Sequence, residues 1–267
     1  YLIERFSYLF LYAAIVYFTV RIAPLGKWVF GILAAMPMAL IQASIITADA
    51  LNNGIAFLFV AWVLYLNREA DRNPFSRRDW IVTALLTLAV CTLKLNALPI
   101  LLILFMVPRA RFGNRKWFLA FILIAALAIL VVGLGWNFLT SSFLVTSETA
   151  ETLSAAEQIK GMIADPAHFV SAVANYIALK SGDTLRDWIG VSGYGYWDLP
   201  EPVYWLVPLI LLLAVLSEGA GARITPKMRI LALITAALLW LETITLFFLL
   251  YSPPGSLVIP RIHGHHF

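Results

Sequence analysis

The hydrophobic positions of this chain gather into long apolar runs, and short polar segments between the runs carry most of the charge. The runs approach the roughly 20 residues that a helix needs to cross a bilayer. They predict about eight membrane-spanning helices, near Phe6–Val20, Trp28–Ile46, Gly54–Leu66, Trp80–Leu93, Leu95–Val107, Trp117–Leu139, Val203–Leu216 and Ile230–Leu250. We therefore expect an all-α fold, that of a polytopic helical membrane protein.

One apolar run, from Trp80 to Val107, is interrupted at Lys94-Leu95-Asn96 and has basic segments on both sides. Two basic segments should face the same side of the membrane, so the run is predicted to enter and return as a short hairpin. Each arm then has about 13 or 14 residues, roughly 20 Å of helix, against a hydrocarbon core of roughly 30 Å. This geometry predicts that Lys94 lies within the outer half of the bilayer.

Composition and charge support a membrane chain with a defined orientation. The sequence is 61% hydrophobic and 13% charged, which excludes an ordinary soluble domain. If odd-numbered spans run inward, one side receives four segments with most of the 19 lysines and arginines: Arg21–Lys27, Asn67–Asp79, Pro108–Lys116 and Ser217–Arg229. The positive-inside rule makes that side cytoplasmic. The net charge of +4 follows this topology, so we expect the lipid bilayer, and no nucleic acid, as a partner.

The longest polar segment, Thr140–Pro202, falls on the outer side and is rich in acids. Within it, Ala155–Ile163 and Pro166–Leu179 have the pattern of two amphipathic helices. Asp165 suits an N-cap and Pro166 a first helical turn, so the two helices should be split at Asp165-Pro166. Helices of this kind are expected on the membrane surface or packed against the bundle.

On this basis the chain divides into three parts. A transmembrane bundle (1–139) is followed by an outer loop with interfacial helices (140–202), and then by a C-terminal pair of spans that leads into another outer segment (203–267). Tyr1 is not an initiator methionine, and the chain stops just after a histidine-rich segment. We therefore expect the sequence to be part of a longer protein.

Asp49 and Asn52 are the first candidate site residues, at the outer turn between the second and third predicted spans. A carboxylate there can bind a cation or a substrate hydroxyl from the outer face. The alternative is a helix N-cap, because Asp49 precedes an apolar run and is followed by asparagines.

Lys94 and Glu242 are candidates because ionisable groups inside a membrane are costly and usually have a function. Lys94 can meet a phosphate near the outer interface, or can extend along its own stem to the headgroups. Glu242 lies deep in an apolar run, where it can pair with a base such as Lys94 or, as a neutral acid, form hydrogen bonds between helices.

The histidines His263, His265 and His266 are the last candidates, because clustered imidazoles can bind a divalent metal. No carboxylate stands in a fixed register with them. A divalent metal is thus the one cofactor that the residues suggest, and no phosphate-loop, serine-hydrolase or metalloprotease motif is present.

Several short motifs together resemble a bacterial family of uncharacterised multi-pass membrane proteins. They are Arg5-x-x-x-Leu9, Ala35-Met36-Pro37-Met38, Asp49-Ala50-Leu51-Asn52, Lys94 ahead of an apolar run ending at Pro108, Gly190–Pro200 and Ile262-His263-Gly264. That family is grouped by fold with the GT-C glycosyltransferases, which use polyprenyl-phosphate-linked sugars. The resemblance implies a GT-C-like fold and a polyprenyl-phosphate partner.

The chain departs from that family at two places. Family members carry an acidic Pro-Asp-Glu-x-x-His-like motif in the first outer loop, the expected site of the catalytic carboxylate, and nothing here corresponds to it. The primary base is therefore expected upstream of Tyr1. In addition, His265-His266-Phe267 stands where the family has Arg-Tyr-Phe.

The leading hypothesis is a GT-C-like glycosyltransferase of the bacterial inner membrane that works at the outer face. Lys94 is assigned to the phosphate and Asp49 to a supporting carboxylate or metal ligand. The alternative is a non-catalytic integral-membrane subunit or scaffold, whose partners are other proteins of a larger complex. A transporter that uses Lys94 and Glu242 is a third hypothesis, but the sequence has no inverted repeat.

Overall fold

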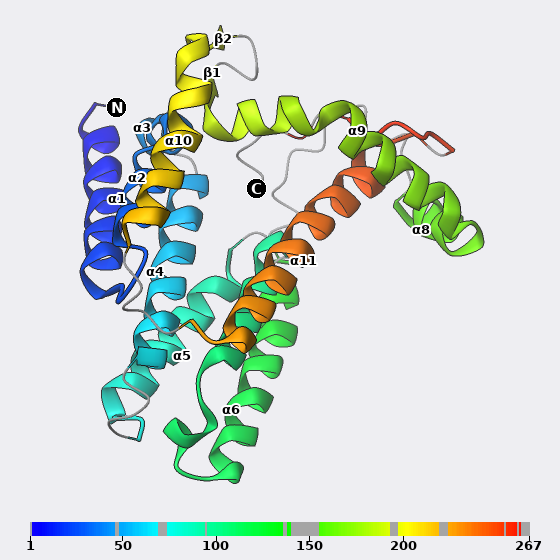
Figure 1. Ribbon diagram of the computed structural model, residues 1–267. Helices are drawn as coiled ribbons and strands as arrows, with labels where there is room; N and C mark the ends of the chain where they lie inside the picture. The colour runs from blue at the N-terminus through cyan, green and yellow to red at the C-terminus, as the bar shows by residue number, and fades with distance from the viewer. Residues whose placement is uncertain are drawn as a thin grey trace.

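The computed structural model of this protein describes residues 2–45, 48–68, 74–93, 95–135, 138–139, 155–192, 197–218, 224–253, 255–260 and 262. Over these residues the chain is almost entirely helical (Figure 1). One short antiparallel hairpin is present, with Val191 opposite Asp198. The prediction of an all-α fold is confirmed over the described residues.

The elements follow one another in a simple order. They are α1 (Leu2–Ile22), α2 (Lys27–Ala34), α3 (Pro37–Ser44), α4 (Ala48–Arg68), α5 (Arg77–Cys91), the 3-10 helices η2 (Leu95–Met106) and η3 (Arg109–Phe112), α6 (Arg115–Ala128), the π-helical turn η4 (Ile129–Leu134), α8 (Ala155–Ala164), α9 (Pro166–Gly190), β1 (Val191–Ser192), β2 (Trp197–Asp198), α10 (Glu201–Ser217) and α11 (Pro226–Tyr251).

Four helices in the described part of the chain are long and apolar enough to cross a membrane: α1, α4, the continuous stretch Arg115–Val132, and α11. The pair α2 and α3 adds a fifth span if it is counted as one. The helix α10 is apolar but shorter. The predicted number of about eight spans is therefore not confirmed.

The segment predicted as one span, Trp28–Ile46, is two helices bent by 56°. The break lies at Met36, whose backbone is extended (φ −59°, ψ 145°), directly before Pro37 at the start of α3. Proline disfavours the helical conformation of the residue before it, and it lacks an N–H to continue the hydrogen bonds. The local sequence therefore explains the bend.

The hairpin predicted over Trp80–Val107 corresponds to α5 and η2. Helix α5 begins with a capping box in which Ser76 and Asp79 exchange side-chain and backbone hydrogen bonds. The second arm, η2, has 3-10 geometry, which rises about 2.0 Å per residue, so its 12 residues extend roughly 24 Å. This arm packs against α4, α5 and α11, and Leu101 and Leu104 belong to the main hydrophobic core. It is thus an interior element of the bundle.

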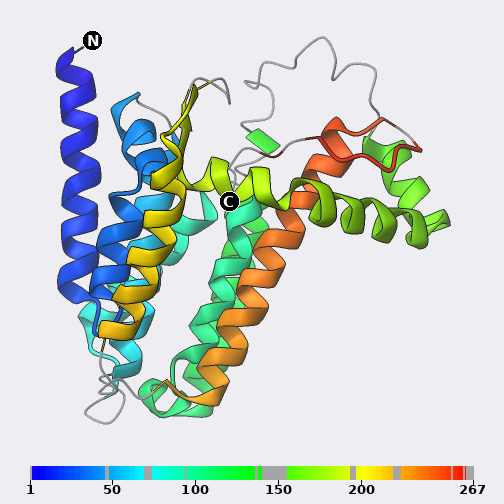
Figure 2. The same ribbon diagram turned by 45° about the horizontal axis from the view of Figure 1, so that its top comes forward.

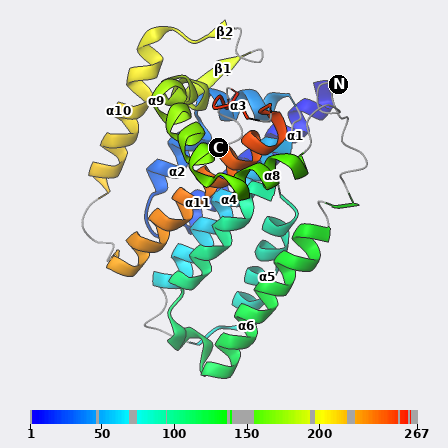
Figure 3. The same cartoon turned by 90° about the vertical axis from the view of Figure 1, so that its right-hand side faces the viewer.

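The two predicted amphipathic helices are present. Helix α8 begins at Ala155 as expected, and the Asp165 carboxylate caps α9 by accepting from the His168 N–H at 3.2 Å. Helix α9 continues to Gly190, beyond the predicted end at Leu179. It runs across one end of the long helices, as Figure 2 and Figure 3 show.

The basic segments meet at the other end. The Glu218 carboxylate, after α10, binds the backbone before and within α2. The Phe75 N–H donates to the Arg111 carbonyl at 2.8 Å, which joins the segments before α5 and α6. Met228, near the start of α11, packs into the core cluster that contains Phe112. The described parts of the four basic segments therefore share one end of the molecule, as the charge pattern predicts.

Candidate functional site

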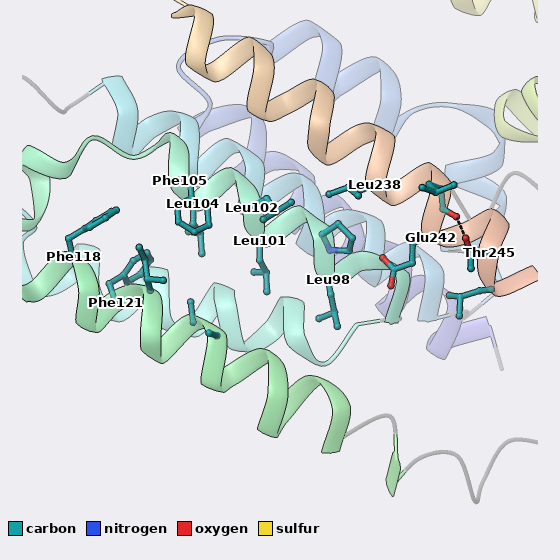
Figure 4. Close-up of a pocket in the computed structure, with 16 residues that line it drawn as sticks. Leu98, Leu101, Leu102, Leu104, Phe105, Phe118, Phe121, Leu238, Glu242 and Thr245 are labelled. Carbon is teal, nitrogen blue, oxygen red and sulfur yellow. Dashed lines mark hydrogen bonds between the residues drawn. The ribbon is translucent and has the colours of Figure 1, made fainter. Parts of the chain in front are cut away.

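An apolar cavity of about 540 Å³ lies between η2, α6 and α11. Figure 4 shows its lining side chains, which come from all three elements. They include Leu98, Leu101, Leu102 and Phe105 from η2, Phe118, Phe121 and Ala125 from α6, and Leu238, Glu242 and Thr245 from α11. The volume is in the range of small-molecule sites in proteins.

The cavity has one polar end. Glu242 and Thr245 lie beside Leu98, and Phe118 and Phe121 lie at the opposite end (Figure 4). The Thr245 hydroxyl donates to the Leu241 carbonyl of its own helix at 2.7 Å. Glu242 is therefore the ionisable group that this cavity presents.

The polar end lies nearer to α9 than to the basic end of the molecule. Glu242 is about 24 Å along α11 from Pro226, and about 14 Å from Tyr251, at 1.5 Å per residue. Beyond it, Phe248 packs edge-to-face on Phe169 of α9, with ring centroids 5.2 Å apart. The cavity is thus polar on the side that α9 covers.

Asp49 and Asn52 lie elsewhere. Both are in the first turns of α4, so Asp49 is inside the helix, where its charge suits the positive end of the helix dipole. Asp49 interacts electrostatically with Tyr8 of α1. Neither residue lines the cavity. The structure therefore does not bring them to Glu242, and their role in substrate binding stays a prediction.

Lys94 and the three terminal histidines, His263, His265 and His266, fall outside the described residues. Within the residues that are described, no group of three or more His, Cys, Asp or Glu side chains could hold a metal ion. The predicted divalent metal therefore also stays a prediction.

Sequence reasoning overlooked two part-buried polar contacts. The Asn53 amide donates to the side-chain oxygen of Gln42 at 3.1 Å, which joins α4 to α3. On α9, the Tyr176 hydroxyl lies 2.7 Å from the Thr184 hydroxyl, and burial raises the pKa of Tyr176. The first contact could have been suspected, because Gln42 is a polar residue inside an apolar run. The second could not, because Thr184 lies beyond Leu179, where the helix was expected to end.

These features define a polytopic helical membrane protein with an apolar cavity whose polar end carries a carboxyl group. The chain belongs to the family described as "Predicted membrane protein (DUF2142)", which matches residues 1–264. No curated protein and no solved structure matches the chain.

Proposed function

We propose that this protein is a GT-C-like membrane glycosyltransferase that uses a polyprenyl-phosphate-linked sugar, and that the cavity between η2, α6 and α11 holds part of the donor's hydrocarbon chain. The observation that supports this proposal is the shape of the site. It is an apolar cavity between three helical elements, and a single ionisable side chain, Glu242, marks one end. A long lipid with one polar terminus has the same distribution of polarity.

The polar end matters more for selectivity than the apolar lining. Lipid tails are as apolar as leucine, so moving a hydrocarbon chain from the bilayer into the cavity gains little free energy. Discrimination must then come from the cavity's shape and from the groups at its polar end. A phosphate beside an ionised Glu242 would be repelled unless a cation were near. We assign that role to Lys94, which directly precedes η2 in the sequence.

In this proposal the end covered by α9 faces outward across a bacterial inner membrane, and the basic end faces the cytoplasm. Asp49 and Asn52, at the outward end of α4, would contact the acceptor or a metal. A carboxylate base would deprotonate the acceptor hydroxyl.

The test is binding of undecaprenyl phosphate, with and without a linked hexose, to the full-length protein in nanodiscs. Ala125→Phe fills the cavity, and we expect it to weaken binding about tenfold, because overpacking costs about 1–3 kcal/mol. The matched control is Leu123→Phe, since Leu123 lies on the same helix, is 70% exposed and does not line the cavity. Equal binding by the two variants would overturn the cavity assignment.

A second measurement tests the phosphate role and separates the enzyme from its alternative. Lys94→Met should retain the protein's fold but lose hexose transfer to an acceptor. Full transfer by this variant would overturn the role of Lys94. Retention of the lipid without any transfer by the full-length protein would support the non-catalytic subunit instead.

A further inference from the structure

A second cavity, of about 580 Å³, opens at the basic end of the molecule. It lies between the starts of α5 and α6 and the η3 turn, at the end opposite α9 (Figure 3). Its walls are Phe75, Trp80, Arg111, Phe112 and Trp117, with Asn114 between them. This cavity combines aromatic walls with a guanidinium group.

Arg111 is the informative residue of this cavity, because it is only 3% exposed. Its guanidinium pairs with Asp79 at 3.3 Å and lies 5.2 Å from the centre of the Phe75 ring. Its carbonyl accepts from the Phe75 N–H. These contacts hold the charge in a fixed position at the cavity wall.

Membrane topology alone does not explain a buried arginine. The positive-inside rule requires only that basic residues lie near the ends of the spans. Exposed residues at the same end already meet that requirement: Arg77, Arg78, Arg109, Arg115 and Lys116. Burying a guanidinium costs free energy even when it is paired, and this buried guanidinium lies at a cavity wall, where a ligand can reach it.

The residues of the segments that form this cavity favour an anionic ligand. Asp79 is the one acid in the described segments 74–93 and 95–135, whereas Arg77, Arg78, Arg109, Arg111, Arg115 and Lys116 lie in the same segments. Trp80 and Trp117 line the cavity, and Trp117 is 60% exposed. Tryptophan favours the headgroup level of a membrane, and basic pockets between spans bind acidic lipid headgroups.

We propose that this cavity binds the phosphate headgroup of an anionic phospholipid, with Arg111 as the fixed cation and Trp80 and Trp117 against the glycerol and the first carbons of the chains. The site is separate from the cavity at Glu242 and does not depend on the proposed glycosyltransferase activity. It would hold the α5–η3–α6 end at a defined depth in the adjacent leaflet.

The test measures quenching of tryptophan fluorescence by brominated lipids in nanodiscs. Brominated phosphatidylglycerol should quench more than brominated phosphatidylcholine at equal content, and Trp117→Phe should remove much of the difference. Arg111→Gln should weaken the preference for phosphatidylglycerol about tenfold, since a charge-assisted hydrogen bond is lost. The double variant Arg111→Gln/Asp79→Asn should lose the preference too. It leaves no unpaired carboxylate, and an unfolding temperature equal to that of the wild type separates loss of binding from loss of the α5 capping box that Asp79 forms with Ser76.

The matched control is Arg229→Gln, which removes an exposed charge at the same end but outside the cavity. We expect it to change the preference less than about twofold. The proposal would be overturned if Arg229→Gln lost the preference for phosphatidylglycerol as fully as Arg111→Gln, or if both Arg111 variants kept it. In either case the basic residues would attract anionic lipids through their summed charge and not through a site at Arg111. Displacement of the lipid by millimolar inorganic phosphate would also overturn it, in favour of a soluble phosphate ligand.

Discussion

Glu218, directly after α10, accepts a hydrogen bond from the backbone N–H of Trp28 at 3.2 Å, although the two residues are 190 positions apart. The same carboxylate accepts from the N–H of Gly26. Gly26 is the N-cap of α2, has positive φ (74°) and carries no side chain that could cap the helix. Glu218 therefore provides the missing cap from another helix and ties α10 to α2.

This cap predicts that Glu218→Ala lowers stability by about 1–2 kcal/mol, because two helix-end N–H groups lose a charged acceptor. The measurement is thermal unfolding of the protein in nanodiscs. Glu201→Ala is the control, since its pair with Arg186 is largely exposed (57% and 44%) and contributes little. If both variants unfold at the same temperature, the interhelical cap is not a significant interaction.

Gly190 predicts a second effect on stability. It ends α9 where the chain meets α3, and a Cβ there would lie 2.9 Å from the Cβ of Pro37 and 2.7 Å from Cδ1 of Leu199. Gly190→Ala should cost about 1–3 kcal/mol, because the Cβ of Pro37 cannot move without shifting backbone, although the Leu199 methyl group can turn away.

Gly182 is the matched control for that substitution, because it lies in the same helix with open space around it. Gly182→Ala should leave stability unchanged or raise it by about 0.5–1 kcal/mol, since alanine loses less backbone entropy in a helix. Urea or thermal unfolding that ranks the two variants in the opposite order would contradict the close approach of α9 to α3.

A buried hydrogen bond between α4 and α5 gives a third prediction. The Trp62 indole N–H donates to the Thr83 hydroxyl at 2.9 Å, and Thr83 is fully buried. Thr83→Val leaves the indole N–H without this acceptor, at a cost of about 1–3 kcal/mol. Thr92→Val, on the exposed end of α5, should change the unfolding temperature much less. An equal fall in the unfolding temperature of the two variants would show that the Thr83 hydroxyl does not stabilise the protein.

Glu242 gives a fourth prediction, in which stability and function separate. Glu242→Leu keeps the cavity apolar throughout and removes a half-buried carboxyl, so the unfolding temperature should not fall. Binding of undecaprenyl phosphate should fall, because the polar end of the site is lost. If Glu242→Leu binds undecaprenyl phosphate as well as the wild type, Glu242 is not part of the binding site. Glu242→Gln tests whether hydrogen bonding without a carboxyl group is sufficient for binding.

The candidate site could be predicted only in part. Glu242 was chosen as an ionisable group inside an apolar run, and it lines the cavity between η2, α6 and α11, but its role in substrate binding stays a prediction. Asp49 was chosen on the same outward end, but it interacts with Tyr8 of α1 and does not line the cavity that holds Glu242. No pattern indicated that Arg111, among many basic residues, would be the buried one.

The sequence by itself determined the all-α class, the gathering of basic segments at one end, and the α8–α9 junction at Asp165-Pro166. Each of these depends on local chemistry: apolar runs, charge near span ends, and capping. Only the tertiary structure decided that η2 is an interior 3-10 arm, that Glu242 faces a cavity, and that Arg111 is buried. In a membrane chain the lipid-facing and the packed sides of a helix are both apolar, so hydropathy cannot tell them apart.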